Sequence, residues 1–237
     1  MTQNFDSFNA RLICARILEG LGNRLHSQAA QIKKNAAIID LTGDREVEWS
    51  WVYSNIPDGD LRVLDFGCGP SPIGSFVAAR RGSLVTAFDL HKYLFPLKLE
   101  RLTPVIGDIL SFNFGATKYD LVLNCSTIEH VGLPGRYGGG EGVDLDFKAM
   151  AVLKSLLCHS GKMVLTLPVG IDNVHLPFHR VYGRRRLPEL LKGWEIEKEE
   201  YWAKSTNNIW EMVTQEQAFE VKSSPKYYGL GLFVLTV

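Results

Sequence analysis

One stretch between residues 62 and 79 limits what this chain can fold into. It begins with the short apolar run that a buried parallel strand needs, Val63, Leu64 and Phe66. Gly67 and Gly69 follow at alternate positions, and residues 73–79 continue with apolar side chains at helical spacing. The stretch therefore predicts a strand, a tight glycine turn and a helix whose N-terminal N–H groups face a ligand.

The turn reads Asp65-Phe66-Gly67-Cys68-Gly69-Pro70-Ser71 and resembles the cofactor loop of class I S-adenosylmethionine (SAM) dependent methyltransferases, Asp/Glu-x-Gly-x-Gly-x-Gly. Ser71 replaces the third glycine, a mild departure because that position mainly sets how closely helix and strand pack. A nicotinamide dinucleotide site would instead need a glycine at Pro72. An NAD-dependent Rossmann oxidoreductase is therefore the second interpretation.

Acidic residues recur at the ends of the next predicted strands. Residues 83–88 predict a second strand that ends at Asp89, about 20 residues beyond the turn, where an acid can accept both ribose hydroxyl protons. Residues 102–106 predict a third strand, and Asp108 follows it where the resembled family holds the adenine. The cofactor positions that the resemblance implies are Asp65, Gly67, Cys68, Gly69, Pro70, Asp89, Leu90, Gly107, Asp108, Ile109, Asn124 and Cys125.

The fourth predicted strand, residues 119–124, leads into a segment where chemistry is expected, because open α/β sheets bind ligands at such strand ends. His130 in this segment suits a general base, since an unperturbed histidine has a pKa near 6.5 and is substantially neutral at pH 7. Glu129 is a weaker base, and His179 is the third catalytic candidate. The alternative is that Glu129 and His130 cap the turn and touch the amino-acid part of SAM.

Residues 163–168 predict the fifth strand. The segment that follows this strand is expected to be a loop rich in His and Arg. His175 and His179 stand four apart, and together with Glu129 and His130 they could ligate a metal if the loop were helical. Nearby proline and glycine argue against a helix, so no metal is expected. The arginine run 184–186 could hold a phosphate or carboxylate of the substrate, or simply start a solvated helix.

The remaining chain predicts helices and strands around this core. Apolar residues at three- and four-residue steps between residues 8 and 37 indicate two amphipathic helices, with a break near Gly20 and Gly22. Asp44 suits the N-cap of a further helix, and Asp144 precedes another that Gly161 is expected to stop.

A single methyltransferase domain is expected, with residues 1–43 as a helical extension or lid and residues 44–237 as its core. Residues 194–201 and 227–237 predict the two terminal strands, and residues 202–226 between them a polar loop. The resemblance implies a three-layer α/β, Rossmann-like fold. Its seven-stranded sheet is mostly parallel, with an antiparallel last strand.

Composition narrows the class of partner. With 46% hydrophobic residues, the 237-residue chain can bury a substantial core. Lys plus Arg equals Asp plus Glu at 26 each, so the chain lacks the bulk positive field of nucleic-acid binders. The sequence lacks a signal pattern, paired cysteines and an apolar run of ~18 residues, which predicts a cytoplasmic protein that uses neither nucleic acid nor membrane. A homodimer is left open.

A second resemblance concerns the class of substrate. Residues 126–133, 136–138 and 144–150 look like a poorly characterised bacterial methyltransferase-like group often associated with glycan or secondary-metabolite genes. Together the resemblances imply an enzyme that transfers a methyl group from SAM to a small molecule and releases S-adenosylhomocysteine (SAH). An oxygen of a sugar, sugar phosphate or related metabolite is the expected acceptor. A SAM- or SAH-binding protein without turnover is the binding-only alternative.

Overall fold

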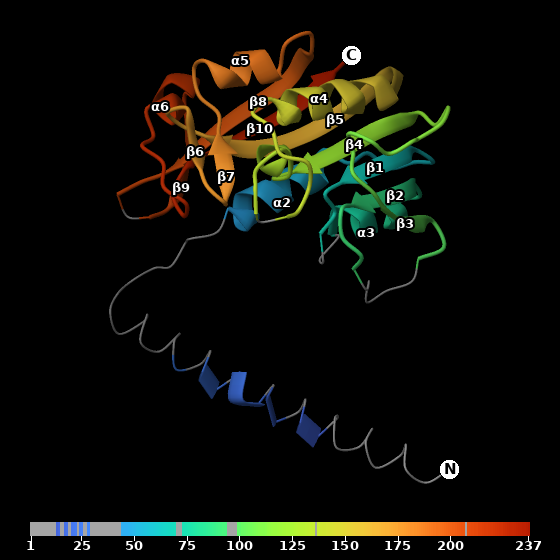
Figure 1. The fold of residues 1–237 in the computed structure, drawn as a ribbon, viewed down its shortest axis with the longest axis horizontal. Helices are drawn as coiled ribbons and strands as arrows, with labels where there is room; N and C mark the ends of the chain where they lie inside the picture. The colour runs from blue at the N-terminus through green and yellow to red at the C-terminus, as the bar shows by residue number, and fades with distance from the viewer. Residues whose placement is uncertain are drawn as a thin grey trace. The chain divides into compact units, whose positions relative to one another are not determined.

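Figure 1 shows the fold in a computed structural model of the chain. The structure describes residues 44–69, 73–93, 99–135, 137–206 and 208–237, with scattered positions between residues 13 and 28. The chain divides into two compact units, Met1–Leu41 and Thr42–Val237. The described positions of the first unit are helical, including Gly20 and Gly22 where a break was expected. A glycine inside a helix costs only about 1 kcal/mol, which neighbouring helix formers can offset.

The second unit is built on an eight-stranded sheet with the strand order β3-β2-β1-β4-β5-β10-β8-β9. Its strands are β1 (Arg62–Phe66), β2 (Leu84–Asp89), β3 (Leu102–Ile106), β4 (Tyr119–Cys125), β5 (Leu157–Val169), β8 (Glu195–Lys204), β9 (Trp210–Val213) and β10 (Gly229–Thr236). Strands β1 to β5 pair in parallel, and β10 lies antiparallel between β5 and β8. The predicted mostly parallel sheet with an antiparallel last strand is confirmed, and the edge strand β9 adds an eighth strand to the seven expected.

Helices cover both faces of this sheet (Figure 1). One face carries α2 (Arg45–Ser54) and α3 (Ile73–Arg80); the other carries α4 (Leu145–Leu156), α5 (Arg186–Leu190) and α6 (Gln215–Phe219). Successive side chains of β4 alternate between the faces, so that Leu121 and Leu123 pack toward α2 and α3 while Val122 packs toward α4. Both faces of the central strands are buried, as a near-continuous apolar run predicts.

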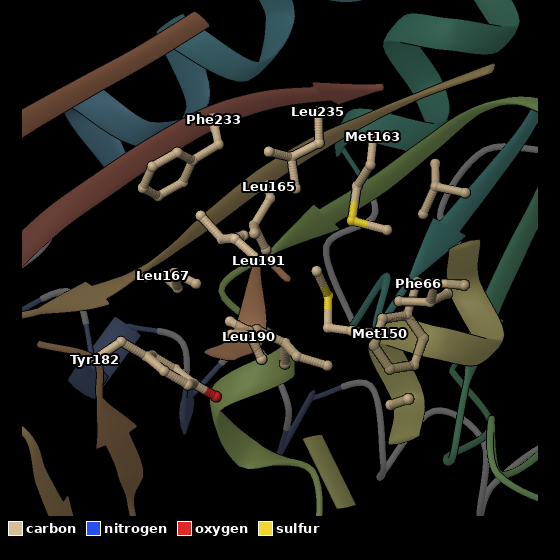
Figure 2. Close-up of a cluster of buried hydrophobic side chains, with 14 of the residues drawn as sticks. Phe66, Met150, Met163, Leu165, Leu167, Tyr182, Leu190, Leu191, Phe233 and Leu235 are labelled. Atoms are coloured by element: carbon tan, nitrogen blue, oxygen red, sulfur yellow. The ribbon is translucent and has the colours of Figure 1, made fainter. Parts of the chain in front are cut away.

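The larger hydrophobic cluster lies on the α4 side of the sheet. Figure 2 shows Met163, Leu165 and Leu167 of β5 beside Phe233 and Leu235 of β10. These five side chains are all fully buried at 0% exposure. Burying each such side chain contributes about 1.5–3 kcal/mol relative to exposure, which ties the antiparallel last strand firmly to the parallel part of the sheet.

Segments expected to be loops contain regular structure. The His- and Arg-rich segment forms a hairpin of β6 (Asn173–His175) and β7 (His179–Val181), and residues 202–226 contain both β9 and α6. α6 begins with a capping box in which the Thr214 hydroxyl accepts from the Gln217 N–H while the Gln217 side chain accepts from the Thr214 N–H. Short strands such as β9 gain most of their stability from a neighbouring strand, and their own residues give only a weak signal.

Helix boundaries also differ from the prediction in their details. Asp44 and Asp144 occupy the N-cap positions of α2 and α4, but neither side chain caps its helix. Asp44 instead accepts a hydrogen bond from the Tyr228 hydroxyl at 2.9 Å. α4 ends at Leu156 rather than near Gly161, because β5 begins at once. In the part of the chain that the structure describes, no helix is both long and apolar enough to cross a bilayer.

Candidate functional site

A cavity of about 430 Å³ opens where β1, β2, β3 and β4 end. Its wall includes most of the residues that the sequence assigned to a cofactor: Asp65, Gly67, Cys68, Gly69, Asp89, Leu90, Gly107, Asp108, Ile109 and Cys125. Pro70 lies outside the described residues. The strand order β3-β2-β1-β4 puts the residues after β2 and β3 toward one end and those after β4, Ser126 and His130, toward the other. Helix α2 contributes Arg45, Trp49 and Tyr53 to the wall. The cavity thus joins the predicted cofactor positions to a predicted catalytic residue.

The glycine turn leaves bare backbone facing this cavity. Gly67 has φ +72° and Gly69 has φ +63°, in the left-handed region that favours glycine. A side chain on Gly67 would overlap Thr127, whereas one on Gly69 would meet, among the described residues, only the Gly67 carbonyl oxygen at 4.0 Å. The turn is therefore closed at Gly67 against the segment that follows β4, and both glycines line the cavity.

Asp65 fixes the helix that follows the turn. Its Oδ2 accepts hydrogen bonds from the Ser75 N–H at 3.0 Å and the Ser75 hydroxyl at 2.6 Å. Burial raises the pKa of Asp65 to about 6, and the two Ser75 hydrogen bonds oppose this shift because they stabilise the ionised form. The carboxylate thus links β1 to α3 at the floor of the cavity.

The acids after β2 and β3 are oriented by their own neighbouring backbone. Asp89 accepts from the Gly69 N–H at 3.0 Å and from the His91 N–H at 3.0 Å, one to each oxygen. Asp108 Oδ1 accepts from the Leu110 N–H at 2.9 Å. Each carboxylate oxygen has lone pairs to spare, so both acids can still accept hydrogen bonds from a ligand.

These features fit SAM by the chemistry of their donors and acceptors. Bare glycine backbone admits close approach, Asp89 can accept from ribose hydroxyls, and Asp108 can accept from an adenine amine. The Tyr53 hydroxyl adds a buried oxygen in the cavity wall that has no hydrogen-bond partner among the described residues. Buried polar atoms are normally satisfied, so this oxygen marks a place for a polar ligand atom.

His130 lies in the short 3₁₀ helix η1 (Ile128–His130) and has a defined orientation. Its Nδ1 stands 2.6 Å from the Phe178 carbonyl oxygen, which can only accept, so Nδ1 carries the hydrogen. Its Nε2 lies 3.5 Å from Glu129 Oε1. Glu129 is buried, and burial raises its pKa well above the usual range. Glu129 does not line the cavity, and its Oε2 has no hydrogen-bond partner among the described residues.

The two predicted cofactor positions at the end of β4 face opposite sides of the sheet. Asn124 lies between Leu123 and Cys125, which line the cavity, so the alternation along β4 turns it to the opposite face. There its amide nitrogen approaches the sulfur atoms of Met150 and Met163. Cys125 is the position in this segment that faces the cavity, and burial raises the pKa of its thiol well above the usual range.

The hairpin β6–β7 brings His175 and His179 side by side, with ring centroids 5.6 Å apart. His175 Nε2 lies 2.9 Å from the Ser223 hydroxyl, and the His179 ring packs against Tyr228. His179 is buried and outside the cavity wall. Over the described ranges, no three His, Cys, Asp or Glu side chains are arranged to hold a metal ion.

The arginines of this region are engaged in ion pairs and backbone contacts. Buried Arg180 donates to the carbonyl oxygens of Val131 and Gly142, which fixes the chain after η1. Arg186 pairs with Asp146 at 2.7 Å, and Arg184 pairs with Glu220 at 2.8 Å. None of these arginines lines the cavity.

One polar network beside the cavity was missed by the sequence analysis. Glu48 of α2 is fully buried, and its Oε1 accepts hydrogen bonds from the hydroxyls of Ser126 and Thr166. Its Oε2 pairs with Arg45. Burial and the nearby Asp44 carboxyl raise the pKa of Glu48, while these three partners favour the ionised form. The only local signal was a glutamate on the apolar side of a predicted helix.

Comparison with protein families gives a match over residues 101–232, more than half of the chain. The chain belongs to the DUF268 family. That family is described as a Caenorhabditis protein of unknown function, so membership in DUF268 leaves the activity open. Comparison with curated proteins finds no match for this DUF268 chain.

Solved structures similar to this DUF268 chain establish its fold. The 1,6-didemethyltoxoflavin-N1-methyltransferase of Burkholderia thailandensis, with 1,6-didemethyltoxoflavin and SAH bound, is 14% identical; the match covers 92% of this chain and 90% of that one, with a TM-score of 0.53. The N-methyltransferase NodS of Bradyrhizobium japonicum in complex with SAH is 13% identical over 81% and 87%, with a TM-score of 0.52. The chain has the class I SAM-dependent methyltransferase fold, as the sequence predicted.

A third similar structure shows that this fold alone does not determine the function. The [4+2]-cyclase SpnF is 17% identical, with 66% of this chain and 58% of that chain covered and a TM-score of 0.50. SpnF is named as a cyclase, not as a methyltransferase. Function in a DUF268 chain must therefore be argued from its own site.

Proposed function

We propose that this chain transfers a methyl group from SAM to a hydroxyl oxygen of a small molecule, with a sugar, sugar phosphate or related metabolite as the acceptor class. The single observation that carries the proposal is the continuous cavity between Asp89 and His130. One end offers the acids and bare glycine backbone that fit an adenosine group, and the other offers a histidine. When bound, SAM supplies an electrophilic methyl group on a sulfonium.

The residues at the second end would orient the acceptor and remove its proton. With Nδ1 donating to the Phe178 carbonyl, Nε2 of neutral His130 is the nitrogen that can accept a proton. A proton on Nε2 would favour ionisation of the Glu129 carboxyl 3.5 Å away, because opposite charges attract strongly at low dielectric. Glu129 would thereby act on the acceptor only through His130.

The first experiment is calorimetric titration of the full chain with SAM, SAH and NAD. We expect SAM and SAH to bind and NAD not to bind, because the turn lacks the third glycine of a dinucleotide site. Binding of NAD alone would contradict the proposal and favour an oxidoreductase. SAH formation from SAM in a panel of sugars, sugar phosphates and amines then separates an enzyme from a protein that only binds the cofactor.

A further inference from the structure

Two hydroxyls donate to the same oxygen of Glu48, but they face different surroundings. Ser126 follows β4 and lines the cavity, whereas Thr166 lies within β5, is fully buried and does not line it. The two residues stand 78 and 118 positions from Glu48 in the sequence. A buried carboxylate that gathers these distant partners holds α2, β4 and β5 together at one point beside the cavity.

The backbone of Ser126 is held in an unusual conformation. Its φ of +46° lies in the left-handed region, which costs a non-glycine residue about 1–3 kcal/mol when maintained by its surroundings. Its N–H donates to both the Thr166 hydroxyl at 3.0 Å and the Thr166 carbonyl at 3.2 Å. Glu48 and Thr166 therefore fix the direction in which the Ser126 hydroxyl points.

The hydrogen of that hydroxyl is already used. Ser126 donates to Glu48 Oε1, so the hydroxyl oxygen keeps its lone pairs to accept from a ligand in the cavity. The carboxylate behind it makes the oxygen a better acceptor, because hydrogen bonds in a chain polarise one another. The hydroxyl oxygen of Ser126 can thus accept a hydrogen bond from an N–H or O–H group of a ligand in the cavity.

The position of Ser126 in the cavity indicates how its hydroxyl oxygen lies relative to the methyl group that is transferred. Asp89 and Asp108 follow β2 and β3 on one side of β1, whereas Ser126 and His130 follow β4 on the other side, and all four line the cavity. A donor whose adenosine occupies the first end must direct its methyl group toward the second. The Ser126 hydroxyl is therefore beside the place where the acceptor would sit.

We infer that Ser126, positioned by Glu48, binds a proton-donating group of the methyl acceptor, separate from the hydroxyl that loses its proton to His130. The acceptor class is then a molecule with neighbouring donors, such as a vicinal diol or an amino alcohol. This inference rests on the proposed function. Ser126 would touch the acceptor, and Glu48 is a positioning residue that acts through Ser126.

The test uses sinefungin, the SAM analogue in which a carbon bearing a primary amine replaces the methylated sulfonium. Its amine stands where the methyl group would be and can donate to Ser126, whereas SAH has no donor there. The ratio of SAH to sinefungin dissociation constants, measured by calorimetry, therefore reports a hydrogen bond at this place without any acceptor. Loss of a hydrogen bond between charged and neutral partners corresponds to about a 10- to 100-fold change.

We expect Ser126→Gly to lower the ratio by about 10- to 100-fold while SAH affinity stays near that of the wild type. Glycine accepts the left-handed φ without strain, so this variant separates the hydroxyl from the backbone. Ser126→Ala should lower the ratio equally although it keeps the strain. Glu48→Gln should lower it less, because the amide oxygen can still accept from Ser126 but carries no charge.

Two matched variants exclude a merely structural effect. Tyr228→Phe removes the hydroxyl that donates to Asp44 at the start of α2, outside the cavity wall, and should lower the melting temperature but keep the ratio within about threefold. Glu46→Gln, exposed on the same helix, should change neither. If Ser126→Gly binds both ligands with the wild-type ratio, the inference is wrong. If the wild-type chain binds neither SAH nor sinefungin, it is the proposed function that fails.

Discussion

The two ends of the cavity are built in different ways. At the proposed cofactor end, each acid has a partner within ten positions: His91 for Asp89, Leu110 for Asp108 and Ser75 for Asp65. Asp89 also accepts from the Gly69 N–H, 20 positions away. At the proposed acceptor end, the side-chain contacts that orient Ser126 and His130 span a long distance in sequence, from Glu48 to Ser126 and Thr166 and from His130 to Phe178.

This difference indicates which end of the cavity can change its ligand specificity in such a fold. Local contacts survive changes elsewhere in the chain, because each strand end carries its own ligand-facing acid and the backbone that orients it. Long-range contacts depend on how α2, β5 and the β6–β7 hairpin pack around β4. We therefore expect substitutions at the cofactor end to affect binding of any SAM-like ligand, and those at the acceptor end to affect turnover or the choice of acceptor.

The largest expected effect is at the glycine turn. Gly67→Val should abolish measurable SAH binding, because its side chain would overlap Thr127 and push apart the turn and the end of β4. The matched control is Gly115→Val, since Gly115 also has a positive φ, +60°, but open space around its Cβ position. Calorimetry and thermal unfolding of both variants separate backbone strain from the clash. If Gly67→Val binds SAH with wild-type affinity, the glycine turn is not part of the cofactor site.

The second effect concerns His130 and separates an effect on turnover from an effect on SAH affinity. His130→Ala should lower turnover by ~10²–10⁴-fold with little change in SAH affinity, the usual scale for loss of a general base. Initial rates of SAH formation with an acceptor from the panel, together with calorimetry, measure both quantities. His159→Ala, an exposed histidine at the start of β5, is the control. Near-normal turnover without the His130 ring would make Glu129 and His130 structural residues only.

The third effect is a pH dependence that originates at Asp65. Burial raises its pKa from 3.8 to about 6, so its contribution to stability is complete below about pH 4 and is lost as the pH rises through about 6. The free energy of unfolding of the wild type should therefore fall relative to Asp65→Asn by up to about 3 kcal/mol between pH 4 and pH 7. Urea denaturation across this range measures the difference. A difference independent of pH would contradict the raised pKa.

The smallest effect tests the proposed ribose contact. Asp89→Ala should weaken SAH by about 10- to 100-fold, which is the range for hydrogen bonds to a charged group. Asp89→Asn, which keeps one accepting oxygen for the Gly69 N–H, should lose less. Asp120→Ala serves as the control, because that acid lies in β4 outside the cavity wall. Unchanged SAH affinity in Asp89→Ala would exclude the ribose contact and leave Asp89 as a turn-forming residue.

The sequence by itself predicted β1 to β4 in their order along the chain and the residues of the proposed cofactor end. Residues 62–79 already predict a strand, a tight glycine turn and a helix, because the residues around the glycines repeat at strand and helix spacing. The positive φ of both glycines is what the structure adds. The acids at positions 89 and 108 follow directly from where β2 and β3 end. Contacts within a few residues are encoded in those residues.

Only the tertiary structure decided the acceptor end. The alternation along β4 turned Asn124 away from the cavity and Cys125 toward it, and the β6–β7 hairpin paired His175 with His179 outside the cavity wall. Glu48 gave little local signal, because a buried glutamate is tolerated only when partners from distant segments satisfy it. Which segments meet is set by burial of apolar surface across the whole sheet, a property that no short stretch of sequence carries.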